Sequence, residues 1–179
     1  MLITAVAIGL LFAFILILRL FVSSEKNSKI VVRTECATPF VLEKMTETEA
    51  EFSSEVIFEN VGGQFATIMD CFARPQLPFE QYDGVLPRGK VEVLGRSRED
   101  DYFEATLIGR HDKLTVLVKV TLTARKGMDI KSALSRMVDL PIDVVYTELG
   151  RRPWRLGKFR VVLTAEKISS LTGVALVDD

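Results

Sequence analysis

LTVLVKVTL, residues 114–122, alternates apolar and polar side chains more regularly than any other stretch of the chain. Its apolar positions are Leu114, Val116, Val118, Val120 and Leu122. The positions between them are polar, with Leu117 as the exception. Because successive side chains of a strand point to opposite faces, the pattern predicts a strand in a sheet with one buried and one solvated face.

Shorter stretches on both sides carry related patterns. We expect extended segments at 30–35, 37–43, 54–59, 65–72, 91–93, 103–107, 142–147 and 158–164. Residues 60–63, 97–101 and 109–112 are rich in Gly, Asn, Asp or charge and are typical of tight turns. About eight short strands joined by such turns predict a mainly β fold, an antiparallel β-sandwich.

Two other stretches lack this alternation. Residues 45–51 are polar and acidic, and we expect a solvated loop there. Residues 73–90 contain three prolines, which remove ladder donors, and predict a long irregular connection.

One inserted α-helix is expected near 129–138. Ile130, Ala133, Leu134 and Met137 repeat at helical spacing. Asp129 is placed to cap the helix start, and a proline follows its end. Residues 166–171 are compatible with one further helical turn.

The stretch Val56–Asp70 resembles immunoglobulin-like modules, in which a strand ends in Asn-x-Gly and the next strand carries small and apolar residues. The resemblance covers about fifteen residues and implies an immunoglobulin-like sandwich. The chain departs from antibody domains, because its single tryptophan, Trp154, lies far from any Cys…Trp…Cys order.

Residues 1–22 form a continuous apolar segment that only Arg19 interrupts. Fifteen of them are Leu, Ile, Val or Phe, which favours membrane insertion by about 5–9 kcal/mol. We expect a single transmembrane helix. A cleaved signal peptide ending near Val22-Ser23-Ser24 is the alternative, but it lacks a positive n-region and its apolar run is too long.

The segment after the span, residues 23–33, is a polar and basic juxtamembrane linker that precedes a β-sandwich domain at 34–179. Lys26, Lys29 and Arg33 outnumber Glu25 there. By the positive-inside rule the domain is expected in the cytoplasm, with an extracytoplasmic placement as the alternative.

Ala5, Gly9 and Ala13 recur every four residues on one face of the expected span. Small residues at this spacing let a second helix approach closely, either another copy of this chain or another membrane protein. Chance accounts for the spacing equally well, because Ala and Gly are common in spans.

Charge and cysteine content narrow the class of protein. The chain carries a net charge of −1, and its first 33 residues are basic, so the remainder is mildly acidic. This argues against nucleic-acid binding. Cys36 and Cys71 lie in no zinc-binding pattern, and the sequence leaves open whether they pair.

No catalytic, cofactor or metal motif is present in the sequence. His111 is the only histidine and lies in an expected turn. The acidic cluster Glu99, Asp100, Asp101 and Glu104 has neighbouring arginines and is better explained as a solvated hairpin tip than as a cation site. Asp70, if buried in its strand, would need an arginine partner.

GRRPWR, residues 150–155, places Arg151, Arg152 and Arg155 around Trp154 between two expected strands. Three interpretations compete. The loop lies on anionic lipid headgroups, or it anchors a protein interface, or Trp154 belongs to the core with the arginines at its rim.

The sequence therefore predicts a single-pass membrane-anchored, non-catalytic β-sandwich that acts as a protein-interaction or structural subunit of a membrane assembly. The competing hypothesis is a membrane-anchored enzyme or ligand-binding domain with a pocket near residues 73–90.

Overall fold

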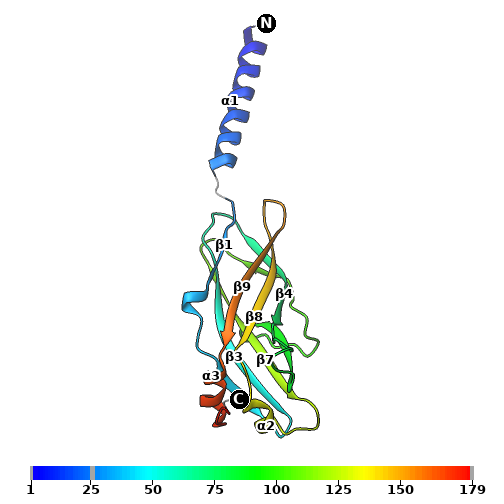
Figure 1. Cartoon of the computed structure of the whole chain (residues 1–179). Helices are drawn as coiled ribbons and strands as arrows, with labels where there is room; N and C mark the ends of the chain where they lie inside the picture. Colours follow the sequence, from blue (N-terminus) through cyan, green and yellow to red (C-terminus); the bar gives the residue numbers. More distant parts are fainter. Residues whose placement is uncertain (1, 25–26, 178–179) are drawn as a thin grey trace.

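The computed structural model describes residues 2–24 and 27–177, and Figure 1 shows a long helix at one end of a mainly β domain. Met1, Glu25, Lys26 and residues 178–179, which the expected span, linker and domain include, lie outside the described residues. We call the end of the domain nearest the helix the anchor end. Two short helices lie at the opposite end.

The elements in chain order are α1 (Leu2–Ser24), β1 (Ile30–Arg33), the 3-10 helix η1 (Thr34–Cys36), β2 (Val41–Met45), β3 (Glu49–Asn60), β4 (Ala66–Pro75), β5 (Val85–Val93), β6 (Thr106–Ile108), β7 (Lys113–Ala124), α2 (Ile130–Leu134), β8 (Leu140–Leu149), β9 (Arg155–Leu163) and α3 (Ala165–Thr172). The last four residues of the expected 23–33 linker thus form β1, which pairs with β3.

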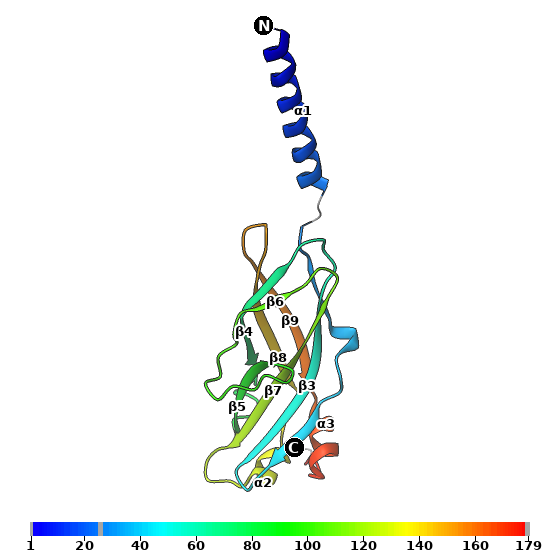
Figure 2. The same cartoon turned by 180° about the vertical axis from the view of Figure 1, so that it is seen from behind.

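The strands form two antiparallel sheets, as the sequence predicted (Figures 1 and 2). Sheet A has the order β1-β3-β7-β5, with β2 also paired to β3. Sheet B has the order β6-β4-β8-β9. The two paths β1-β3-β7-β5 and β4-β8-β9 follow the ABED and CFG strand orders of immunoglobulin constant domains.

The core lies between the sheets and confirms the alternation in residues 114–122. Val116, Val118, Val120 and Leu122 of β7 are fully buried. Phe58 of β3 packs edge-on against Tyr146 of β8, with ring centroids 4.9 Å apart. This aromatic contact joins the two sheets.

Two expected loops are shorter than predicted. Glu49–Asn60 is one continuous strand whose buried Ala50 and Phe52 continue the core face, so only a tight turn remains of the loop expected at 45–51. Likewise β4 runs to Pro75 and β5 begins at Val85. Pro87 fits in β5 because this is an edge strand, where one side of the backbone has no ladder partner.

The strand expected at 103–107 is reduced to the three residues of β6, Thr106–Ile108. Residues 94–105 leave the sheet, and Phe103 nevertheless reaches the core.

Asp70 does not lie buried in its strand, the case in which it would need an arginine partner. It is exposed, with φ +49°, at a β-bulge between Met69 and Phe72, and therefore needs no buried arginine.

The helix expected near 129–138 is present but shorter, because α2 ends at Leu134. Asp129 caps it as predicted, accepting a hydrogen bond from the Ser132 N–H at 3.0 Å. The four residues of its apolar stripe are all buried. The expected turn at 166–171 is a two-turn helix, α3, capped by Thr164.

Helix α1 is solvent-exposed along its described side chains and makes no core of its own. Its segment Thr4–Ser23 has the length and composition needed to cross a membrane, properties that secretion signals share.

Candidate interaction surface

The anchor end of the sandwich is held together by Asn60, a fully buried side chain at the end of β3. Its Oδ1 accepts hydrogen bonds from the N–H groups of Lys29 (3.3 Å) and Gly62 (3.0 Å). Its Nδ2 donates to the carbonyl oxygens of Gln64 (2.7 Å) and Gly109 (2.9 Å). One amide thus joins the segment entering from α1 to the β3–β4 and β6–β7 turns.

The segment after α1 packs closely on this end of the domain. A Cβ on Gly62 would lie 2.5 Å from the Lys29 nitrogen, so the backbone approaches as only glycine allows. Arg151, in the β8–β9 turn, donates from Nη1 to the Val22 carbonyl oxygen of α1 at 3.0 Å. The β8–β9 hairpin is therefore the part of the domain that contacts the end of α1.

The predicted Arg and Trp residues lie together on this hairpin, and all are exposed. Trp154 is 66% exposed, so of the three interpretations the one that places it in the core is wrong. The reason is geometric: residues 150–154 project beyond Glu148 and Arg155, the last residues paired between β8 and β9, and no described element covers them. In the amide orientation of Asn27 that satisfies both its oxygen and its nitrogen, the oxygen accepts a hydrogen bond from Arg152 Nε at 2.9 Å.

The outer surface of sheet B carries an unexpected group of apolar side chains, which we call the apolar face. Its members are Met69, Phe72, Leu107, Leu149 and Leu156. Leu107 and Leu156 are 61% and 67% exposed. Strand register places them in three successive rows, Leu107–Thr67–Leu149, Met69–Thr147–Leu156 and Phe72–Val145.

Sequence reasoning missed these residues. Leu149 and Leu156 lie outside the expected strands 142–147 and 158–164, so their shared face was not visible. Phe72 points outward because the bulge at Asp70 inserts one extra residue into β4. Leu107 is exposed between the buried Thr106 and Ile108, whereas the sequence pattern of the expected strand grouped it with Phe103.

A charged cluster borders the apolar face on the side that lies away from α1. Asp143 of β8 is nearly buried between Arg160 and Lys158 of the edge strand β9. Arg160 Nε donates to Asp143 Oδ1 at 2.7 Å, and Lys158 Nζ to Oδ2 at 3.1 Å. These hydrogen bonds, from Arg160 first, lower the Asp143 pKa to about 2. The ion pairs also place charge on an open sheet edge, which opposes unwanted strand pairing.

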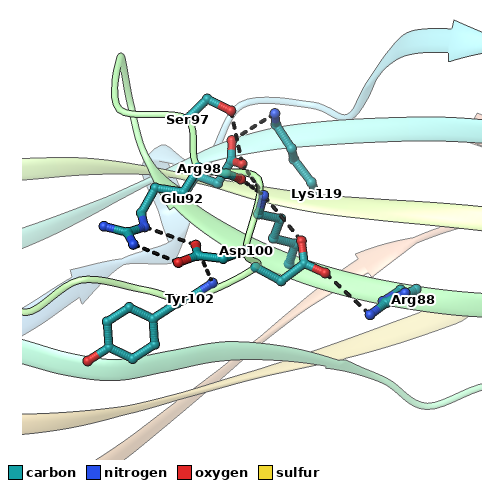
Figure 3. A network of polar contacts seen from close by, with 9 residues as sticks. Arg88, Glu92, Ser97, Arg98, Asp100, Tyr102 and Lys119 are labelled. Carbon is teal, nitrogen blue, oxygen red and sulfur yellow. Dashed lines mark hydrogen bonds and ion pairs between the residues drawn. The ribbon is translucent and has the colours of Figure 1, made fainter.

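The outer surface of sheet A is polar and contains a buried carboxylate, Glu92 of β5 (Figure 3). Lys119 Nζ lies 2.8 Å from its Oε2, and Lys90 Nζ lies 2.6 Å from its Oε1. Ser97 donates to Oε1 at 3.2 Å. Burial acts to raise the Glu92 pKa, but the lysine hydrogen bonds outweigh it and hold this pKa below its ordinary value. A fully paired carboxylate of this kind fixes the covering loop.

The acidic cluster at 99–104 forms ion pairs instead of a cation site. Arg98 forms two hydrogen bonds with Asp100 (Figure 3). Its Nη1 also lies 3.4 Å from Glu104 Oε2. Asp101 pairs with Arg88 and Lys90. Among residues 2–24 and 27–177 no group of three or more His, Cys, Asp or Glu side chains is arranged to hold a metal ion.

Residues 81–84, within the proline-rich connection, do border a hollow beside α2. Two of its polar side chains have partners within the chain. Tyr82 donates its hydroxyl to the Ala133 carbonyl oxygen, and Asp83 pairs with Lys126 at 2.6 Å. The described side chains of this hollow therefore present no free acid–base pair or nucleophile.

His111 and Cys36 are exposed elsewhere, and burial raises the pKa of the Cys71 thiol to about 12.

No protein-family model matches the sequence, and no curated protein matches it. Among solved structures, the GAE domain of GGA2p from Saccharomyces cerevisiae is similar at a TM-score of 0.35 and 8% identity, covering 77% of this chain and 98% of that one. The yeast GGA1 GAE domain has a TM-score of 0.32 and 6% identity, covering 69% of this chain and 97% of that one. TM-scores below 0.5 define no family for this chain.

Proposed function

We propose that this chain is a single-pass membrane protein whose β-sandwich has no catalytic role and binds another protein as part of a membrane assembly. The observation that carries the proposal is the apolar face. Four of its side chains, Phe72, Leu107, Leu149 and Leu156, are large, apolar and exposed on one surface of sheet B. Exposed apolar side chains gathered in neighbouring rows of one sheet, unlike single scattered ones, are typical of a protein-binding site.

The span is supported by the physical properties of α1. The 20 residues Thr4–Ser23 extend about 30 Å, which is the thickness of a bilayer's hydrocarbon core. None of this segment is buried against the domain, so its apolar side chains have no other cover among the described residues. Arg19 lies near its end, where a long side chain reaches the headgroups.

Orientation and helix contacts extend the proposal. The basic residues after the span support a cytoplasmic position of the domain by the positive-inside rule. Ala5, Gly9 and Ala13 offer a face on which the partner's own span, or a second copy of α1, packs closely. A Cβ added at Gly9 would meet no described atom within 4 Å, so that position is open to a neighbouring helix.

Two lysines on the apolar face test the proposal. The Leu107→Lys/Leu156→Lys variant should lose a complex that the wild type retains after mild detergent extraction, measured by native electrophoresis. Burying two unpaired ammonium groups at an interface is expected to weaken association roughly a hundredfold.

The matched control is Thr115→Lys/Thr121→Lys, which adds the same charge to the outer surface of sheet A. It should leave the complex intact. A wild-type chain that migrates as a monomer, or a control that dissociates equally, would refute binding through this face.

A further inference from the structure

The β8–β9 hairpin combines positive charge and aromatic surface without an acidic neighbour in its turn. Arg151, Arg152 and Arg155 are exposed, and residues 149–157 contain no carboxylate. No carboxylate among the described residues forms an ion pair with these three guanidinium groups. Arg155 lies opposite Glu148 in the β8–β9 ladder without an ion pair to it, and the charge of Arg151 and Arg152 in the turn is available to a partner outside the chain.

A second aromatic residue lies beside the hairpin. Phe65, 51% exposed, starts the approach to β4, and its carbonyl oxygen would be 3.5 Å from a Cβ on Gly150. The Arg110 guanidinium stands 5.8 Å from the Phe65 ring centroid. Trp154 and Phe65 thus give this end of the domain two exposed aromatic rings, each with arginine nearby.

The position of the hairpin relative to α1 decides which partner fits. Figure 1 shows the hairpin as the element of sheet B that extends furthest toward α1. Arg151 contacts the Val22 carbonyl oxygen, one residue before the end of the segment Thr4–Ser23. If α1 spans a bilayer, the last residues of the span mark the headgroup layer, and the hairpin lies at that depth.

We propose that residues 150–155 dock on anionic lipid headgroups of the bilayer that α1 spans, an inference that rests on the proposed anchoring. Arginine donates paired hydrogen bonds to phosphate, and tryptophan is favoured at the level of the headgroups. The cytoplasmic leaflet carries the anionic lipids that attract such basic segments. Docking holds the domain against the membrane and fixes the direction in which the apolar face points.

The chain offers a direct probe, because Trp154 is its only tryptophan. The full chain is reconstituted into vesicles of phosphatidylcholine alone or of phosphatidylcholine and phosphatidylserine in equal parts, each with brominated acyl chains. We expect bromine to quench Trp154 fluorescence strongly in the anionic vesicles and weakly in the neutral ones. Salt at about 1 M, which shortens the screening length to roughly 3 Å, should abolish the difference in quenching between the two kinds of vesicle.

Arg152→Gln/Arg155→Gln should weaken docking roughly thirtyfold, because each basic residue near an anionic surface contributes about a factor of five. The charge-matched control is Lys44→Gln/Lys131→Gln, at the end of the domain opposite α1, which should quench like the wild type.

Flotation of the same vesicles separates the two proposals. A chain that floats but whose Trp154 is quenched in neither vesicle, or equally in both, would overturn docking on anionic lipid while leaving the anchor intact. If Trp154 is shielded from a quencher in native membranes but in neither vesicle, the hairpin contacts a protein. That result would also overturn docking on lipid. A chain that does not float would remove the anchoring proposal, and the hairpin inference with it.

Discussion

Replacing Leu10 and Leu11 by arginine is expected to shift the chain from the membrane fraction to the soluble or aggregated fraction. Each arginine at the centre of a span costs about 2.5–3.5 kcal/mol, and each lost leucine removes roughly 0.5 kcal/mol more. The total of about 6–8 kcal/mol is comparable to the whole insertion free energy that the apolar residues of α1 supply. Density-gradient flotation of cell membranes measures the partition.

The control adds two arginines at the end of the span, where a charged side chain costs little. Leu20→Arg/Val22→Arg lies at the end of α1, beside Arg19, where arginine side chains extend to the headgroups. This variant should float with the membranes. Equal loss of both variants from the membrane fraction would point to a general folding defect, and retention of both would show that α1 does not hold the chain in the bilayer.

Asn60→Ala is expected to destabilise the domain by about 3–4 kcal/mol. The substitution leaves the N–H groups of Lys29 and Gly62 and the carbonyl of Gln64 without their side-chain partner. Each buried polar group that loses its partner costs about 1–3 kcal/mol, and water entering the site recovers part of this. For a domain of this size the change corresponds to roughly 10 °C in Tm.

Thermal unfolding of the full chain in detergent micelles tests this value, with Gln81→Ala as a control that removes an exposed amide. Amide hydrogen exchange adds a local readout, because Lys29 and Gly62 should exchange faster in the Asn60 variant. A change in Tm no larger than that of the control would show that Asn60 does not organise the anchor end.

The sequence was informative wherever one physical pattern dominated. The alternation at 114–122 placed four residues in the core, and Asp129 marked the start of α2. These patterns depend on local backbone geometry, which neighbouring residues determine. The irregular connection was predicted too long at its second end, because the tolerance for Pro87 depends on β5 being an edge strand, and strand order is a property of the whole sheet.

The candidate surface was harder to predict for the same reason. Leu107, Leu149 and Leu156 come from three strands, and only register brings them into neighbouring rows. The Arg and Trp residues of 150–155 were identified because they are adjacent in sequence. Whether Trp154 was buried depended on how far the hairpin projects beyond its last paired residues, which composition does not encode.

The β8–β9 hairpin and the apolar face have different roles in the two proposals. In our account the hairpin contacts lipid and sets the orientation of the sandwich. The apolar face, on the outer surface of sheet B, then points along the membrane toward a partner held in the same bilayer. The charged cluster around Asp143 borders this face and places charge on the open edge of β9, which opposes strand pairing there.

The most direct test is photo-crosslinking in intact cells with a photoreactive residue in place of Leu156, followed by alkaline extraction of the membranes. We expect a specific protein adduct that stays in the extracted membrane pellet, and no such adduct from position 121 on the outer surface of sheet A. Release of the chain into the alkaline supernatant, or adducts from position 121 and none from position 156, would contradict it.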